Sequence, residues 1–189
     1  MSAQQAFNNA QEHYNEVIKV LEDFGNMISA ATDGQFSTDI ALLQFDCILQ
    51  YILLHEAIAD GRISKHEEQF INLITDRGNI LAVVSEKTGV TLTWDDLEGI
   101  DADNGIKLIS AMTPIYMELL DDFLGSIAKV DAYIKEIDLL EIINKKVVAI
   151  FVAFANVDGV VEDIERDVVV DAYVKLFVEC YQKIVEENQ

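Results

Sequence analysis

Hydrophobic residues recur at helical spacing along nearly the whole chain, and this pattern is the strongest constraint on the fold. Over residues 7–28, apolar side chains follow one another at steps of three or four and so form one stripe on a long helix. Residues 114–137 carry a similar stripe, and residues 38–59 and 146–157 are apolar around most of the helix circumference. The only proline, Pro114, leaves the other helical stretches uninterrupted. The sequence therefore predicts an all-α protein of about seven to nine helices.

The connecting segment 80–111 has a less regular pattern. Its glycines and its polar run at 101–104 predict short helices joined by turns. Thr93, with Asp96 three residues later, has the spacing of a helix N-terminal cap. Two further helices are expected over residues 65–76 and 163–185.

Charge and hydrophobicity together limit the classes of partner. The net charge is -21, but 51% of the residues are hydrophobic, so the chain has ample material for a core and does not resemble a disordered protein. Nucleic acids and anionic membrane surfaces are bound through Lys and Arg. We therefore expect no nucleic-acid partner and no membrane insertion, since the longest apolar run, 147–157, is shorter than the roughly 20 residues a span needs. Cations or a basic protein partner suit this surface better.

The termini and the cysteines bear on the compartment. Residues 1–10 are polar and lack the basic and apolar regions of a signal peptide. Cys47 and Cys180 each lie in an apolar helical pattern, and two cysteines do not make a disulfide framework. These features predict a protein of the reducing cytoplasm. Its oligomeric state stays open, because the stripe over 7–28 could pack within one chain or between two.

The two ends of the chain share one order of features. Each contains a long amphipathic helix, an apolar helix, an Asp-Gly pair and a further helix. We therefore expect a single domain over 1–189, built from pseudo-repeated halves at about 1–79 and 112–189 and joined by residues 80–111.

The shared element reads Asp-Gly-x-(Ile or Val)-x-x-x-Glu. It runs from Asp60 to Glu67 in the first half and from Asp158 to Glu165 in the second. The spacing matches the second part of an EF-hand calcium loop, but Phe154 stands where the first ligand of the second loop would be. Two complete EF-hands are therefore not expected, whereas the four acidic residues remain candidate cation ligands.

A purely structural interpretation explains the first motif equally well. Gly61 suits the left-handed position that ends a helix, and Ile63 supplies the accompanying apolar contact. Ser64 and Glu67 have the spacing of a capping box. In the second motif Glu162 replaces the serine, which weakens the capping interpretation there. Both interpretations stay open at the level of sequence.

The segments ADGRISKHEEQFI and VDGVVEDIERDVV, each after an apolar helix, resemble the two acidic motifs of the tellurite-resistance protein B (TerB-like) family. The resemblance implies an all-helical cytoplasmic domain of two pseudo-repeats, linked to bacterial resistance to tellurite and other stresses. It also implies a carboxylate cluster for divalent cations and no enzymatic activity. Carried onto this chain, the implied cation ligands are Asp60, Glu67, Asp158 and Glu165.

The sequence thus predicts a non-enzymatic, stress-associated binding protein that holds calcium, magnesium or manganese, the hard ions that carboxylates prefer. The alternative is an acidic helical scaffold that docks a basic partner without any metal. An enzyme with paired carboxylates is a weaker third hypothesis, since no phosphate loop, zinc motif or nucleophile motif is evident. His55 and His66 are expected to have no functional role.

Overall fold

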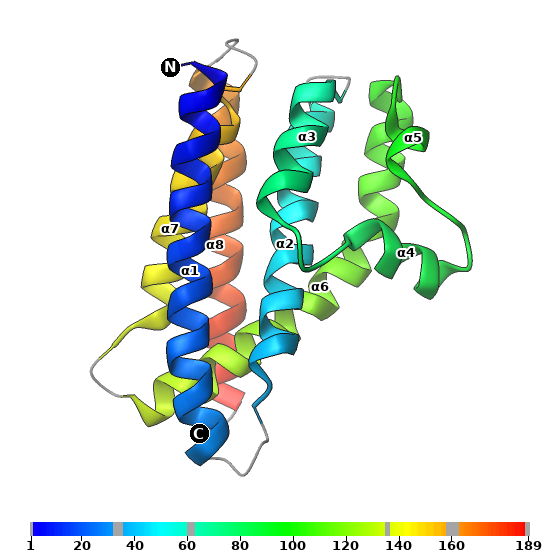
Figure 1. Cartoon of the computed structure of the whole chain (residues 1–189). Coiled ribbons are helices and arrows are strands. Elements are labelled where there is room, and N and C mark those ends of the chain that lie inside the picture. The colour runs from blue at the N-terminus through cyan, green and yellow to red at the C-terminus, as the bar shows by residue number, and fades with distance from the viewer. Residues whose placement is uncertain (1, 32–35, 60–62, 135–136, 158–162, 188–189) are drawn as a thin grey trace.

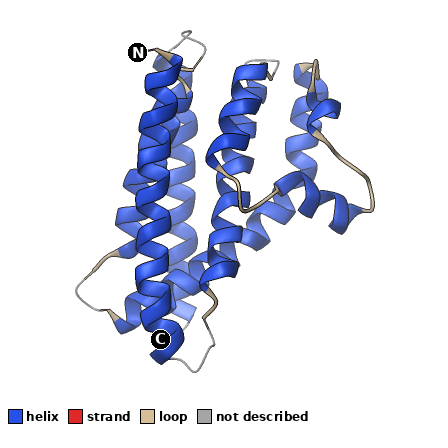
Figure 2. Ribbon diagram, viewed as in Figure 1, coloured by secondary structure: helices blue, strands red, loops and turns tan. Residues whose placement is uncertain are grey.

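The computed structural model describes residues 2–31, 36–59, 63–134, 137–157 and 163–187; within them, the side chains of 27, 28, 30, 31, 59, 102 and 163–170 are not described. These ranges contain eight helices and no strand (Figure 2), so the predicted all-α class is confirmed. The helices are α1 (Ala3–Ala31), α2 (Thr38–Ala59), α3 (Lys65–Ile74), α4 (Ile80–Thr88), α5 (Trp94–Leu97), α6 (Ala102–Tyr133), α7 (Leu139–Phe154) and α8 (Asp163–Glu187).

The helices of the two chain halves are interleaved. In Figure 1, α1, α7 and α8 run side by side, while α6 passes along α2. The two most extensive helix contacts are α1 on α7 and α6 on α2. Each long amphipathic helix therefore covers the apolar helix of the other half, and the core extends through both halves.

The apolar helix α2 lies at the centre of the core. It contacts α1, α3, α4, α6, α7 and α8. Its side chains from Phe45 to Leu54 are buried, as its all-round apolar pattern predicted, although Leu43 is 44% exposed. The stretch Thr38–Ile58 is long and apolar enough to cross a membrane, but 78% of its apolar 18-residue window is buried inside the bundle. Interior packing accounts for its composition.

Helix α6 begins earlier than the sequence pattern indicated. Residues 102–111 were expected to form turns and short helices before a helix at Pro114, but they are the first turns of α6. The side chain of Asp101 caps this helix by accepting a hydrogen bond from Asn104 N at 2.9 Å. Gly105, expected at a turn, lies inside α6. A Cβ at this position would lie 2.4 Å from Cγ2 of Ile58 on α2. This glycine lets α6 approach α2 closely.

Pro114 lies inside α6 rather than at its start. Proline has no N–H to donate to the carbonyl one turn earlier, and its ring crowds that carbonyl. Figure 1 shows that α6 changes direction partway along its length, as a helix with an internal proline commonly does. The bend lets α6 follow α2 and then cross toward α7 and α8.

The remaining helix boundaries follow local caps. The predicted cap at Thr93 is confirmed, since the carboxylate of Asp96 accepts hydrogen bonds from the backbone N–H and the hydroxyl of Thr93. Helix α7 begins at Leu139, ahead of the expected 146, because Asp138 accepts a hydrogen bond from Glu141 N at 2.8 Å. Helix α3 ends at Ile74, two residues earlier than expected.

Two buried polar residues of α2 hold the connection between α3 and α4. Asp46, fully buried, accepts hydrogen bonds from the Tyr14 hydroxyl at 2.7 Å and from the backbone N–H groups of Arg77 and Gly78 at 2.7 and 3.0 Å. One turn later, Gln50 donates to Gly78 O at 2.9 Å, and its carbonyl accepts from a neighbouring backbone N–H. These side chains provide hydrogen-bond partners for backbone groups of the loop that the core shields from water.

This arrangement leaves no room for a side chain at residue 78. A Cβ on Gly78 would lie 2.7 Å from Cβ of Asp46 and 2.8 Å from the Leu43 carbonyl oxygen. We expect Gly78→Ala to lower the free energy of unfolding by about 1–3 kcal/mol through overpacking. Gly125→Ala is the control, because a Cβ there meets no atom within 4 Å and a helical Gly→Ala change stabilises by about 0.5–1 kcal/mol. Urea denaturation of both variants measures this contrast, and a neutral Gly78→Ala would contradict the close approach.

A buried and a half-buried carboxyl group, those of Asp46 and Asp131, predict a stability that falls as the pH rises. Burial raises the pKa of Asp46 and of Asp131 despite the hydrogen bonds that each accepts. Below the ordinary Asp pKa both groups are protonated in the folded and the unfolded chain. As the pH rises toward the folded-state pKa, the unfolded chain releases its protons first, so the folded state loses relative stability. Self-repulsion from the net charge of -21 acts in the same direction.

We therefore expect a higher melting temperature at about pH 5 than at about pH 7.5. Glu16, Asp96 and Glu141 have lowered pKa values and oppose this trend, but all three are exposed on the surface, where such pairs contribute little. Desolvation also lowers the pKa of His55, which opposes the trend because the unfolded chain takes up this proton first as the pH falls. One half-buried imidazole thus acts against two carboxyl groups and the self-repulsion of the net charge. Thermal melts over this pH range test the prediction, and Asp131→Asn should reduce the pH dependence. A melting temperature that rises steadily toward pH 7.5 would contradict it.

Candidate functional site

The helices that precede the two Asp-Gly motifs end at the same end of the molecule. Figure 1 shows that α7 terminates near the start of α1 and that α2 terminates at the same end of the molecule, beside α3. The ring of Phe70 on α3 packs edge-on against Phe154, the last residue of α7, with centroids 5.1 Å apart. The ring of Phe7 on α1 also packs edge-on against Phe70, with ring centroids 6.2 Å apart. The fold therefore brings the helix that follows the first motif to the helix that precedes the second.

Of the four predicted cation ligands, Glu67 is the one whose side chain the structure describes. Asp60 and Asp158 lie outside the described residues, and Glu165 belongs to α8 but its side chain is not described. Among the described residues, no group of three or more His, Cys, Asp or Glu side chains is arranged to hold a metal ion.

Glu67 is buried and forms the capping box predicted for the first motif. Its side chain is only 4% exposed, and Oε2 accepts a hydrogen bond from Ser64 N at 2.6 Å. In return, Ser64 Oγ accepts a hydrogen bond from Glu67 N at 3.2 Å. Both halves of the box are therefore present at the start of α3. This geometry explains the buried carboxylate without a ligand, as the structural interpretation of the first motif anticipated.

A buried aromatic and polar cluster between α2, α6 and α8 was not predicted. His55, expected to have no role, lies with Nδ1 2.5 Å from the Tyr173 hydroxyl. Tyr51, one turn earlier on α2, shares a hydrogen bond of 2.9 Å with the Thr113 hydroxyl and stacks on Tyr116 with centroids 4.2 Å apart. The four-residue spacing of Tyr51 and His55 places both on one face of α2, which the sequence shows. Their partners, Thr113 and Tyr173, lie 62 and 118 residues away, so the sequence does not reveal the cluster.

Burial keeps this cluster uncharged at neutral pH. Desolvation lowers the pKa of His55 and raises the pKa values of Tyr51, Tyr116 and Tyr173. The Tyr116 hydroxyl is buried and makes no hydrogen bond with any described residue. Neutral aromatic groups that connect three helices favour a structural role over acid–base chemistry, which requires a group poised near the working pH.

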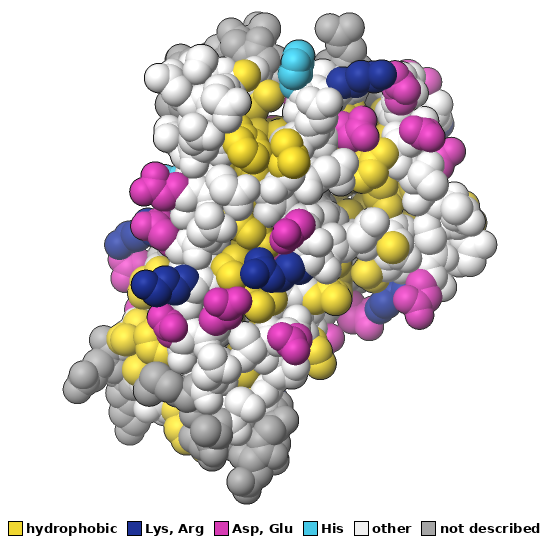
Figure 3. Space-filling view, viewed as in Figure 1, with side chains coloured by type: hydrophobic (Ala, Val, Ile, Leu, Met, Phe, Trp, Pro, Cys, Tyr) yellow, Lys and Arg dark blue, Asp and Glu magenta, His cyan; other side chains and the backbone are white. Residues whose placement is uncertain are grey.

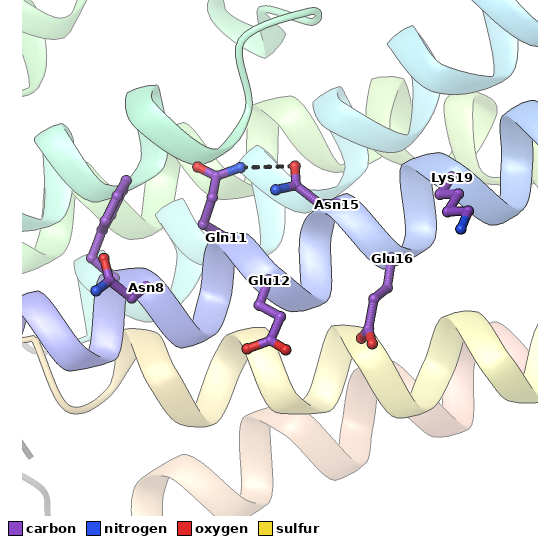
Figure 4. Close-up of a pocket in the computed structure, with 7 residues that line it drawn as sticks. Asn8, Gln11, Glu12, Asn15, Glu16 and Lys19 are labelled. Carbon is purple, nitrogen blue, oxygen red and sulfur yellow. Dashed lines mark hydrogen bonds between the residues drawn. The ribbon is translucent and has the colours of Figure 1, made fainter.

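A shallow pocket of about 510 Å³ lies along α1 and is shown in Figure 4. The labelled side chains all come from this one helix, and Gln11 donates a hydrogen bond to Asn15 at 3.2 Å. Glu12 and Glu16 point toward α7, where Lys146 lies 2.5 Å from Glu16. The hydrogen bond from Lys146 lowers the pKa of Glu16. Ligand sites typically have polar groups that point into the pocket from several elements, whereas the polar groups here all come from one exposed helix face.

A larger groove of about 600 Å³ lies between α7 and α8. Val148, Val174, Val178 and Tyr181 contribute its apolar lining, and the exposed Glu141–Lys145 ion pair adds charge beside them. Asp138, Asn144 and Gln182 add further polar side chains to the lining, so apolar and polar groups both border this groove.

No family model matches this chain, and no curated protein or solved structure matches it either. The resemblance to the TerB-like family therefore remains a prediction that rests on the two motifs.

The capping box yields a prediction about stability. We expect Ser64→Ala to lower the free energy of unfolding by about 1 kcal/mol, because it removes the acceptor for Glu67 N. Glu67→Gln should change stability much less, since glutamine can also serve at this position of a capping box. Chemical denaturation of the two variants measures the difference. An equal loss in both variants would show that the carboxylate charge, rather than the cap, determines the effect.

Proposed function

We propose that the protein is a non-enzymatic, stress-associated binding protein of the TerB-like kind. It binds a divalent cation at the end of the molecule where α2 and α7 terminate, through Asp60, Glu67, Asp158 and Glu165. The observation that carries the proposal is the 5.1 Å contact of Phe70 with Phe154, which brings the two motif-bearing regions together. Carboxylates are the ligands that calcium, magnesium and manganese prefer.

The burial of Glu67 is compatible with this role. Its carboxylate supplies the oxygen ligands that hard divalent cations such as calcium prefer. The net charge of -21 raises the local concentration of cations around the whole molecule. Cys47 and Cys180 are both free, which agrees with the proposed cytoplasmic location.

Calorimetry with calcium, magnesium and manganese tests the proposal. We expect binding with a dissociation constant of about 0.1–1 mM or tighter, together with an increase in melting temperature. Asp60→Asn and Asp158→Asn should each weaken binding about tenfold, because each removes a charged ligand. Glu67→Gln should weaken binding while keeping the cap, whereas Ser64→Ala should lose stability and keep its cation affinity.

A matched control addresses the general acidity of the chain. Glu118→Gln with Glu179→Gln removes two exposed carboxylates that pair with Lys87 and Lys175. This variant should retain the wild-type cation affinity. Absence of both heat and thermal shift at millimolar ion, or an equal loss in the control and the motif variants, would contradict a specific site.

The complete capping box favours a second candidate function, an acidic helical scaffold for a basic partner in which both turns are purely structural. In that case Asp60→Asn and Asp158→Asn would leave partner binding intact. Added salt would weaken the association, because it screens charges on the protein surface.

A further inference from the structure

A third pocket lies beside the first motif, between the start of α3 and α5. Its volume is about 320 Å³, within the size range of small-ligand sites. Ile63 pairs with Glu98 in a parallel β-bridge, the only bridge among the described residues, and this contact joins the two walls. The lining includes Ile63, Ser64, Glu68, Trp94, Leu97 and Glu98, which we call the Trp94 pocket.

The Trp94 pocket combines apolar surface with carboxylates. Leu97 is 1% exposed, and Ile63 and Trp94 are half-buried, so one part of the lining is apolar and held by the core. Glu68 and Glu98 add two carboxylates. In Figure 3, apolar side chains gather between α3 and α5, with charged side chains beside them.

The charges of the lining select the class of ligand. Lys65 also lines the pocket, and its Nζ lies 3.7 Å from Oε1 of Glu98. Lys65 is 77% exposed, so it neutralises Glu98 only weakly, and the lining keeps a net negative charge with Glu68. An anion would be repelled there. A metal ion would find no ligand in the indole or the aliphatic side chains, whereas an organic cation gains from both the carboxylates and the aromatic ring.

We propose that the Trp94 pocket binds a lysine or arginine side chain of a basic peptide segment in a partner protein. The alkyl stem would lie against Ile63 and Trp94, and the cationic head would pair with Glu68 and Glu98. Long basic side chains bury their stems on apolar surface and keep their charge near polar groups in this way. The ion pair from Lys65 shows that Glu98 already accepts an ammonium group. The pocket borders the first motif through Ile63 and Ser64, but its carboxylates, Glu68 and Glu98, are not among the proposed cation ligands. The inference rests on the second candidate function, the docking of a basic partner, and not on cation binding.

Trp94 is the only tryptophan, so its fluorescence reports on the pocket directly. We expect acetylated hexalysine, added to the full-length protein at low salt, to cause a saturable change in Trp94 emission. Hexaglutamate should cause none. Glu68→Gln combined with Glu98→Gln should weaken hexalysine binding about tenfold, and Lys65→Met should strengthen it about two- to threefold by removing a competing ammonium.

The double variant Glu118→Gln with Glu179→Gln again serves as control, because it lowers the net negative charge equally while leaving the pocket intact. It should bind hexalysine as the wild type does. Trp94→Leu, measured by calorimetry with melting curves to confirm folding, should lose binding severalfold. No emission change with hexalysine, or an equal loss in both double variants, would overturn the proposal. Neither result bears on calcium binding, which has its own calorimetric readout.

Discussion

The structure depends on the burial of α2, a helix without a continuous polar face. Such a helix must be covered on all sides, because each exposed apolar side chain forgoes the free energy of leaving water. Six other helices contact α2, and the long helix α6 makes the most extensive of these contacts. Gly105 allows α6 to come close to Ile58, and Pro114 accompanies the bend that carries α6 around the core. The cover of α2 thus comes from both ends of the chain.

The same constraint explains why polar groups appear inside. Asp46 and Gln50 lie on α2 itself, where they bind the backbone between α3 and α4. Their hydrogen bonds replace water for a loop that passes directly over the central helix. The loop position fixes the direction of α4 and, through it, the path to α5. The Trp94 pocket forms where that path returns to the start of α3.

The end of the molecule near Phe154 combines structural and proposed functional demands. Glu67 caps α3, and it also belongs to the motif that the proposed cation site requires. A carboxylate at a helix start accepts a hydrogen bond from the backbone of the cap residue and interacts favourably with the helix dipole. Stability and binding can therefore be separated by substitution, because glutamine preserves the cap and removes the charge.

Local sequence patterns determined the helical class, the buried character of α2, the stripe on α1 and the caps at Ser64 and Thr93. Each of these depends on residues within a few turns of one another, where spacing fixes the geometry. Tertiary structure alone decided that Gly105 is a contact point rather than a turn and that His55 meets Tyr173 across 118 residues of chain. It also decided that α3 and α5 enclose a pocket. Such pairings depend on which helices pack against each other. Helical periodicity identifies the face of a helix that is buried, but it does not identify the helix that covers this face.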